Sequence, residues 1–243
     1  MKALILLVAV VLLWGGCAAT PKVVANNPEA KAAIEARAAD RMLLSSRGCE
    51  SATAGTGNKI ITYQGKTHVA WLDSNEAGYF VVIRTLDRKT GKWSRQHTIG
   101  TSHDNHGRPA LTIDSEGYLH VVYGLHHNPI PYRRSVRPND ASAWTEPVTF
   151  GSRLSYPTLM CGHDDSLYLT GRFGWAGVRL YVKPPGKPWE DRGLIMRSEE
   201  NCRGYAAFHS GLSWGPKQRV LHFACRTVQS TERRPSGMWG GRQ

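Results

Sequence analysis

The sequence predicts an all-β protein, and more specifically a β-propeller built from four-stranded antiparallel blades. Three observations lead to this prediction. Turn-forming residues are frequent, with 25 glycines and 13 prolines among 243 residues. Short apolar runs separated by Gly, Asp, Asn and Pro turns follow one another from about residue 58 onwards. A pattern also recurs about every 49 residues, which is the size of one propeller blade.

The repeat is clearest in one strand of each copy, where residues 117–123, 166–172 and 219–226 align. Each copy then continues to an outer strand that carries a tryptophan, and an earlier copy begins near Lys66. The tryptophans are Trp93, Trp144 and Trp189. Four-stranded units are therefore expected at about 58–100, 107–150 and 153–197, with another starting near Arg203.

The number of blades is too small for a closed ring. About three and a half blades are present, whereas propellers close with about four to eight. The chain is therefore expected to be the N-terminal portion of a larger propeller, either truncated or ending with partial closure. A β-sandwich with coincidental spacing is the alternative fold.

The N-terminus has the pattern of an export signal. Met1-Lys2 precedes an apolar run from Ala3 to Trp14 and the small residues that follow, which is too short to span a membrane as a mature helix. The ending Gly15-Gly16-Cys17 resembles a bacterial lipoprotein signal with Cys17 as the lipidated residue, while cleavage after Ala19 and an uncleaved anchor are the alternatives. The expected order is signal peptide (1–19), leader and linker with a short helix from Pro28 to Leu44 (20–57), blades (58–226) and irregular tail (227–243).

Charge and compartment narrow the choice of partner. The net charge of +12 indicates an anionic partner, and export makes an acidic polysaccharide more plausible than nucleic acid. The membrane is expected to be reached only through the N-terminal lipid. No CxxC pair occurs, so the four remaining cysteines are expected to form one or two disulfides or to be buried thiols. They are Cys49, Cys161, Cys202 and Cys225.

The segment from His103 to His127 contains the main candidates for chemistry. His106 precedes one strand and His126-His127 follow its hairpin partner, so both clusters are expected at the same end of the hairpin. In the next blade Tyr156 and Arg172 occupy comparable positions, and Tyr205 and Arg226 do so in the last. The predicted catalytic group is therefore His106, His126 or His127, Tyr156 and Arg172. Candidate substrate-binding residues are His103, Asn105, Arg133, Arg134, Tyr205 and Arg226.

This combination of residue types suits β-elimination on a uronate polysaccharide. Histidine can act as base, acid or cation near neutral pH, and Arg172 is a permanent cation that can bind a carboxylate through two hydrogen bonds. Tyr156 can relay a proton. Glycoside hydrolysis normally needs two carboxylates, whereas Asp114, Glu116 and the pair Asp164-Asp165 are expected in turns.

The same segments resemble a known family. Residues 103–109, the turn and strand at 114–120 and Tyr132-Arg133-Arg134-Ser135 are similar to propeller proteins with bacterial-neuraminidase-type repeats, which include the ulvan lyases. The resemblance covers roughly residues 58–226. It implies a site of two histidines, a tyrosine and an arginine, which here are His106, His126 or His127, Tyr156 and Arg172.

The expected function is that of a polysaccharide lyase that cleaves an acidic, uronate-containing glycan such as ulvan. The alternatives are a glycan-binding propeller without catalysis, a sialidase-like glycoside hydrolase and a truncated inactive fragment. No cofactor is required by this chemistry. A structural Zn²⁺ or Ca²⁺ held by His103, Asp104 and His106 is an alternative role for that loop.

Overall fold

The computed structural model describes residues 42–49, 57–174, 177–197, 207–215 and 220–227. The chain divides into two compact units, residues 1–44 and 45–243, and the strands all belong to the second unit. In the described part of the chain, no helix is long and apolar enough to span a membrane. The expected signal peptide, Cys17 and most of the leader lie outside the described residues. Residues 42–44 are not helical, so the predicted leader helix does not extend to Leu44.

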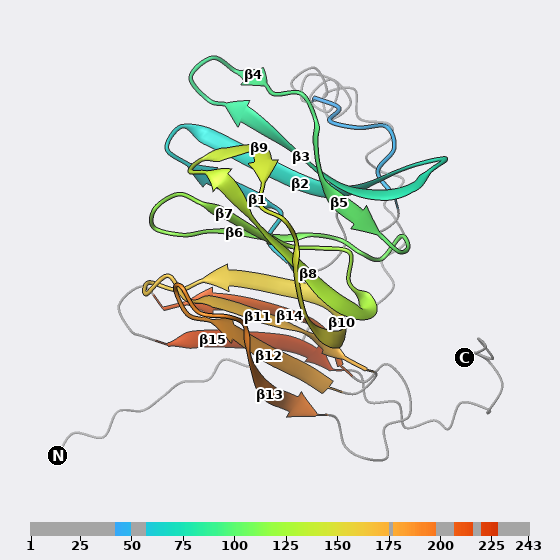
Figure 1. Ribbon diagram of the computed structural model, residues 1–243, viewed down its shortest axis with the longest axis vertical. Helices are drawn as coiled ribbons and strands as arrows, with labels where there is room; N and C mark the ends of the chain where they lie inside the picture. Colours follow the sequence, from blue (N-terminus) through green and yellow to red (C-terminus); the bar gives the residue numbers. More distant parts are fainter. Residues whose placement is uncertain (1–41, 50–56, 175–176, 198–206, 216–219, 228–243) are drawn as a thin grey trace, which may run out of the picture. The chain divides into compact units, whose positions relative to one another are not determined.

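The first blade is a five-stranded antiparallel sheet in which two short outer strands share one neighbour (Figure 1). A tight turn joins its first two strands, with positive φ at Gln64 (38°) and Gly65 (79°), the combination that matches the twist of a hairpin. The third strand pairs with both outer strands. The strands are β1 (Ile60–Tyr63), β2 (Lys66–Asn75), β3 (Gly78–Asp87), β4 (Lys92–Trp93) and β5 (His97–Ser102).

The second blade begins with the hairpin that the sequence predicted. Asp114 accepts a hydrogen bond from the backbone N–H of Tyr118 (2.7 Å), and Gly117 has a φ of 89°, so the turn closes tightly between two buried strands. The strands of this blade are β6 (Ala110–Ile113), β7 (Leu119–Val122), β8 (His126–Arg137) and β9 (Asp140–Trp144), and its outer edge is completed by the start of β10 (Val148–Cys161).

The third blade uses the rest of β10 as its first strand. The strands that follow it in antiparallel order are β11 (Leu167–Phe173), β12 (Gly177–Lys183) and β13 (Glu190–Arg197), and Trp189 lies one residue before β13. A further antiparallel pair, β14 (Ala207–Trp214) and β15 (Leu221–Thr227), starts a fourth unit. The all-β propeller prediction is confirmed.

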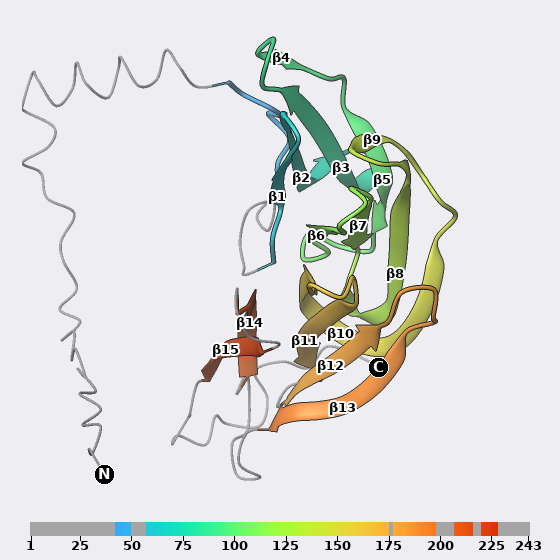
Figure 2. The ribbon, with the colours of Figure 1, turned by 90° about the vertical axis from the view of Figure 1, so that its left-hand side faces the viewer.

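Strand β10 belongs to two blades, which the sequence did not reveal. Residues 148–150 pair with the middle of β8, and residues 154–161 pair with β11. The strand bends between these parts, where Gly151 (φ 54°) and Arg153 (φ 58°) adopt left-handed conformations. The expected boundary at 150–153 therefore falls inside a strand, and the two blades form one eight-stranded hydrogen-bonded sheet (Figure 2).

The first strands of neighbouring blades lie side by side and place two apolar cores between them. The backbone N–H of Leu111 donates to the backbone carbonyl of Asn58 (2.7 Å), and the backbone N–H of Cys161 donates to Thr112 Oγ1 (3.0 Å). Strand β6 is therefore hydrogen-bonded to both adjacent blades. One core includes Leu72, Ile99 and Leu111, and the other includes Leu125, Leu154 and Leu169. All six side chains are fully buried.

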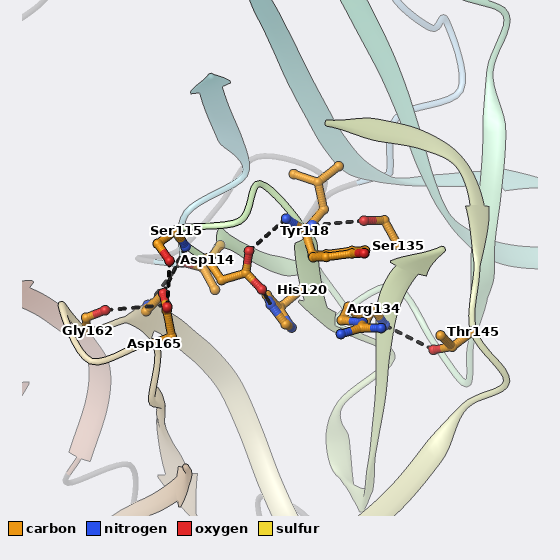
Figure 3. Close-up of polar contacts among 12 residues, drawn as sticks. Asp114, Ser115, Tyr118, His120, Arg134, Ser135, Thr145, Gly162 and Asp165 are labelled. Atoms are coloured by element: carbon orange, nitrogen blue, oxygen red, sulfur yellow. Dashed lines mark hydrogen bonds and ion pairs between the residues drawn. The ribbon is translucent and has the colours of Figure 1, made fainter. Parts of the chain in front are cut away.

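At one end of the blades, turn carboxylates act as structural links (Figure 3). Asp165 accepts hydrogen bonds from the backbone N–H (2.8 Å) and Oγ (2.6 Å) of Ser115, which joins the turns of the second and third blades. His120 lies between Asp114 Oδ2 (3.0 Å) and the hydroxyl of Tyr132 (2.6 Å). Asp114 and Asp165 lie in turns, as expected, and their contacts with Ser115 and His120 are structural.

The three cysteines that the structure describes, Cys49, Cys161 and Cys225, form no disulfide with one another. Cys202 lies outside the described residues, as does the tail from residue 228. Strand β15 reaches Thr227, one residue beyond the predicted end of the blades.

Candidate functional site

The predicted site residues meet at the opposite end of the strands from Asp165, and the strand register explains why. Ser155 on β10 is paired with His126 on β8 and also with Arg172 on β11. His126 and Arg172, which are 46 positions apart in the sequence, are thereby held on either side of Ser155. His106 is brought to the same edge because its loop leads directly into β6.

The loop that carries His106 is closed by short polar contacts. Asp104 Oδ1 accepts the backbone N–H of His106 (2.8 Å), and Ser102 Oγ donates to the backbone carbonyl of Asp104 (2.7 Å). Gly107 packs so closely that a Cβ there would lie 1.8 Å from Ser102 Oγ and 2.8 Å from Gly124 Cα. Any side chain at Gly107 would therefore displace the loop and His106 with it.

His106 and His126 form a stacked pair of imidazoles. Their ring centroids are 4.4 Å apart and their planes differ by 17°. His126 Nδ1 makes a short hydrogen bond with Asp104 Oδ2, and His106 Nδ1 lies 3.6 Å from Asp104 Oδ1. The side chains of His106 and His126 are 35% and 22% exposed, so both rings remain accessible to a ligand.

His127 differs from its neighbour in both contacts and charge. Its backbone N–H donates to Ser155 Oγ (3.1 Å), and its Nε2 lies 3.0 Å from Arg172 Nη2. Burial, followed by the positive charge of Arg172, lowers the pKa of His127. Because a guanidinium only donates, Nε2 is the acceptor and His127 is the neutral Nδ1–H tautomer in this contact.

Tyr156 lies against two buried guanidinium groups. The guanidinium carbons of Arg108 and Arg172 are each 4.5 Å from the centroid of its ring, and the side chains are 4% and 1% exposed. The ring of Tyr156 is 6.5 Å from that of His106 and 6.4 Å from that of His126. The site therefore combines two accessible imidazoles, one phenol and two buried cations.

The backbone is strained at this site. Tyr156 has a φ of 57° and His127 a φ of 66°, in the left-handed region that costs a non-glycine residue about 1–2 kcal/mol. Such strain persists only where surrounding contacts determine the conformation, and it is common at functional sites. Here it turns two side chains of regular strands toward the same cluster.

Positive charge accumulates beneath the accessible rings. Nε and Nη1 of Arg108 are buried and have no hydrogen-bond partner among the described residues. Burial is the main cause that lowers the pKa of Arg108, and Arg172 lowers it further. Burial and the charge of Arg108 also lower the pKa of Lys59 to about 8. The cluster is suited to bind or stabilise negative charge.

Sequence reasoning missed Arg108 and assigned Asp104 only as a metal ligand. Asp104 is the carboxylate that contacts both stacked rings, and Arg108 directly follows the Gly107 turn. A cation immediately before the buried stretch that starts at Pro109 was an available signal, because charged side chains are rarely buried without a purpose.

Three side chains of the site carry atoms that can bind a metal ion. Ligand atoms of Asp104, His106 and His126 lie within 4.8 Å of one another. A metal accepts an imidazole lone pair in the plane of the ring, at about 2.0–2.1 Å for Zn²⁺. Two stacked planes that differ by 17° do not meet at such a distance, so the pair does not fit one shared ion. His103, the third ligand proposed from the sequence, is exposed.

Of the remaining predicted binding residues, Arg133 and Arg134 are not brought into this cluster. Asn105 contributes a backbone carbonyl that faces Cys49 Sγ (3.8 Å), and Arg133 donates to the carbonyl of Ile99 (2.5 Å). Arg134 lies eight positions along β8 from His126, stacks on Tyr118 (4.3 Å) and lines a cavity of about 600 Å³ near Asp165. Tyr205 and the side chain of Arg226 lie outside the described residues.

The fold and the cluster together define a β-propeller that carries a histidine, tyrosine and arginine site at one end of its blades. The family model described as "BNR repeat-containing family member" matches residues 66–225. The chain belongs to this family, as the sequence pattern predicted.

Two ulvan lyases are similar to part of the chain. It is 29% identical over 153 residues to "Ulvan Lyase-PL25" of Pseudoalteromonas sp. (strain PLSV), which covers 49% of the chain and 31% of the relative. It is 27% identical over 135 residues to "Ulvan lyase" of Alteromonas sp. (strain LOR), which covers 45% of the chain and 27% of the relative. The match therefore spans about a third of these relatives.

The solved structure of a "Polysaccharide lyase PL25-Ulvanlyase bound to -[GlcA(1-4)Rha3S]-" has the same fold. It superposes with a TM-score of 0.60 at 19% sequence identity, over 76% of this chain and 48% of that chain. A second structure, of a "Polysaccharide lyase PL25-Ulvanlyase", superposes with a TM-score of 0.61 at 20% sequence identity.

Proposed function

We propose that this protein is a polysaccharide lyase that cleaves an acidic, uronate-containing glycan by β-elimination. The observation that carries the proposal is the stacked pair His106–His126 beside Tyr156, with two buried guanidiniums behind the phenol ring. Homology to ulvan lyases over part of the chain supports the same reaction class and a substrate of the ulvan type.

In this reaction, the proton on C5 of the uronate passes to a base and the electron pair of the C–H bond forms the C4–C5 double bond. The C4–O bond then breaks, and the leaving glycosidic oxygen takes a proton from an acid. We assign the base to the Nε2 atom of His126 or His106, and the acid to the hydroxyl of Tyr156. No water is consumed, and the negative charge that develops next to the carboxylate is offset by cationic groups.

The contacts support different roles for His126 and His127. His126 stacks on His106 and keeps one ring nitrogen outside its bond to Asp104. His127 uses Nε2 to accept from Arg172, so its lone pair is occupied. We therefore place His126 in the proton-transfer group and His127 as a residue that orients Arg172.

The burial of Arg172 favours an indirect role over the direct contact with a carboxylate that the sequence suggested. A side chain that is 1% exposed cannot make two hydrogen bonds to a substrate carboxylate in this conformation. Its guanidinium instead lies over the ring of Tyr156 and contacts His127. We propose that Arg172 acts as a fixed charge that stabilises the anionic transition state from behind the phenol.

The test is the formation of unsaturated products. Incubation of the 243-residue protein with sulfated, uronate-containing glycans should produce absorbance in the near ultraviolet. His106→Ala should abolish it with little change in unfolding temperature, because the side chain is partly exposed. His222→Ala, on an exposed position of β15, is the matched control and should retain full activity. Absence of product from the unmodified protein across the glycan panel would refute the proposal.

A glycan-binding propeller without catalysis is the second candidate. The buried cations and the accessible rings would also suit an acidic sugar that is bound and not cleaved. Binding measured by calorimetry, with no absorbance change and no new reducing ends, would favour this candidate. New reducing ends without unsaturation would indicate a hydrolase, which the single carboxylate of the cluster disfavours.

We further propose that the protein is exported and anchored through lipid on Cys17. The basis is the N-terminal sequence pattern, together with the polysaccharide named in the relatives. Metabolic labelling with a radioactive fatty acid should mark the protein, and Cys17→Ala should remove the label. An unlabelled wild-type protein would leave ordinary secretion as the explanation.

A further inference from the structure

The geometry points to Asp104 as the positioning residue of the site: one carboxylate holds His106 and His126 in their stacked arrangement and fixes which nitrogen of His126 carries its proton. This inference rests on the proposed function only for its effect on turnover. The arrangement of the three side chains is independent of any substrate.

The two oxygens of Asp104 face two different rings. Oδ2 accepts from His126 Nδ1, while Oδ1 accepts the backbone N–H of His106 and lies 3.6 Å from its Nδ1. A carboxylate is the one common side chain with two adjacent acceptors, and their spacing suits two rings stacked 4.4 Å apart. Asp104 therefore orients the ring of His126 through a direct hydrogen bond and positions the ring of His106 through its backbone N–H.

The bond to Asp104 has a consequence for proton transfer. An ionised carboxylate can only accept, so a neutral His126 must carry its proton on Nδ1. Its lone pair is then on Nε2, the nitrogen that remains available to take a proton from a ligand. The same logic makes the orienting acid of a hydrolase triad control the tautomer of its histidine.

The charge state of Asp104 supports this assignment. Burial by itself would raise the pKa of Asp104, but the backbone N–H of His106 and the bond from His126 outweigh it, and the pKa is lowered. The carboxylate is therefore ionised at any pH at which a histidine can act as a base.

A second aspartate–histidine pair in the second blade provides an internal comparison. Asp114 Oδ2 lies 3.0 Å from His120 Nε2, but the other ring nitrogen is taken by Tyr132 (2.6 Å), and His120 is 6% exposed. Both ring nitrogens of His120 are thus occupied by hydrogen bonds that stabilise the fold. The pair at Asp104 differs because, among the described residues, the second ring nitrogen of His126 has no such partner and the ring is 22% exposed.

The decisive variant is Asp104→Asn. The amide oxygen is expected to keep the bond from the backbone N–H of His106, which turns the amide NH₂ group toward His126. Because an NH₂ group donates, Nδ1 of His126 must become the acceptor, and the proton moves to Nε2. The variant should therefore invert the tautomer of His126 while the loop keeps its conformation.

Nitrogen-15 NMR of the imidazole rings measures this directly and needs no substrate. The wild-type protein should show His126 as the Nδ1–H tautomer at a pH where it is neutral, and Asp104→Asn should show Nε2–H. Asp114→Asn is the matched control and should change the signals of His120 alone. An Nε2–H tautomer in the wild type, or no change in Asp104→Asn, would overturn the inference.

Kinetics give a second, separate readout. In Asp104→Asn, kcat should fall by about 10²–10⁴-fold, the range that positioned acid–base catalysis supplies, while KM changes less than about threefold. Asp114→Asn should lower the unfolding temperature and retain kcat. If the wild type has no lyase activity, the proposed function fails, but the NMR result still decides the role of Asp104.

A titration with Zn²⁺ distinguishes the remaining interpretation. Because the stacked rings do not fit one shared ion, Zn²⁺ added in stoichiometric amounts should leave the signals of His106 and His126 in place. Tight binding of one equivalent that is lost in Asp104→Asn would show a metal site, and it would overturn the positioning role.

Discussion

Replacement of Arg108 by Met is expected to make the protein more stable and less active. Arg108 is 4% exposed, and its Nε and Nη1 have no hydrogen-bond partner in the described part of the chain. Each buried, unsatisfied polar group costs about 1–3 kcal/mol. Methionine has a similar unbranched stem and would bring neither charge nor unsatisfied donors.

The size of the expected gain in stability depends on the distance between Arg108 and the second cation, Arg172. Arg108 and Arg172 each lie 4.5 Å from the same ring centroid, so their guanidinium carbons are at most about 9 Å apart. Two like charges at that distance repel by about 2 kcal/mol at an effective dielectric constant of about 20. The loss of one cation–π contact in a desolvated site costs about 1–2 kcal/mol. With the two unsatisfied donors removed as well, the net change should be a gain of at least about 2 kcal/mol.

The assay is thermal unfolding at neutral pH. A domain of about 150–250 residues gains about 2–4 °C per kcal/mol, so Arg108→Met should unfold at least about 4 °C higher than the wild type. Arg134→Met is the control, because Arg134 also stacks on a tyrosine (Tyr118, 4.3 Å) but is exposed, and it should gain nothing. An unfolding temperature more than about 2 °C below that of the wild type would refute the view that Arg108 is a destabilising buried charge. Turnover should fall, since the ring of Tyr156 loses one of its cations.

Three further predictions concern other parts of the molecule. Arg172→Lys should lose most lyase activity, measured as product absorbance, because an ammonium cannot lie flat on the ring of Tyr156 and also reach His127; an unchanged kcat would contradict this. Burial lowers the pKa of three histidines, so below pH about 6.5 the unfolded chain binds more protons than the folded one. The stability that these neutral histidines contribute is complete above that pH. It is lost as the pH falls through their folded-state pKa values. The unfolding temperature should therefore drop from about pH 7.5 to about pH 5, and a flat profile would oppose the assignment. These histidines are His68, His97 and His127. Gly100→Ala should destabilise by about 1–3 kcal/mol in denaturant unfolding, since a Cβ would lie 2.2 Å from the ring of Tyr123, whereas Gly211→Ala, with nothing within 4 Å, should have a much smaller effect.

The sequence carried enough information for the blade pattern and for the end of the blades at which the site lies. Both depend on local periodicity and on turn residues such as Asp114 and Gly117, which act over a few positions. The prediction that His106, His126, Tyr156 and Arg172 leave the same edge depended only on counting strands. The structure brings these four together, and their catalytic roles remain proposals.

What could not be predicted depends on contacts between distant residues. The left-handed conformation of Tyr156 has no local signal, because bulky residues rarely adopt positive φ, and the modest enrichment of histidine at positive φ does not single out His127. The burial of Arg172 follows from packing among three strands, which the order of residues along the chain does not show. Arg133 and Arg134 were grouped by adjacency, but neighbouring residues of a strand point to opposite faces.

Strand β10 has a consequence for how the repeats can be inherited and engineered. Copies in repeat proteins are usually gained or lost at loops, where a cut leaves each sheet complete. Here the join between the second and third copies is inside a strand, so excision of either copy would leave an unpaired edge on the other. The smallest module that can be exchanged with its hydrogen bonding intact is therefore the pair of blades, and Tyr156 is transferred together with the histidines it faces.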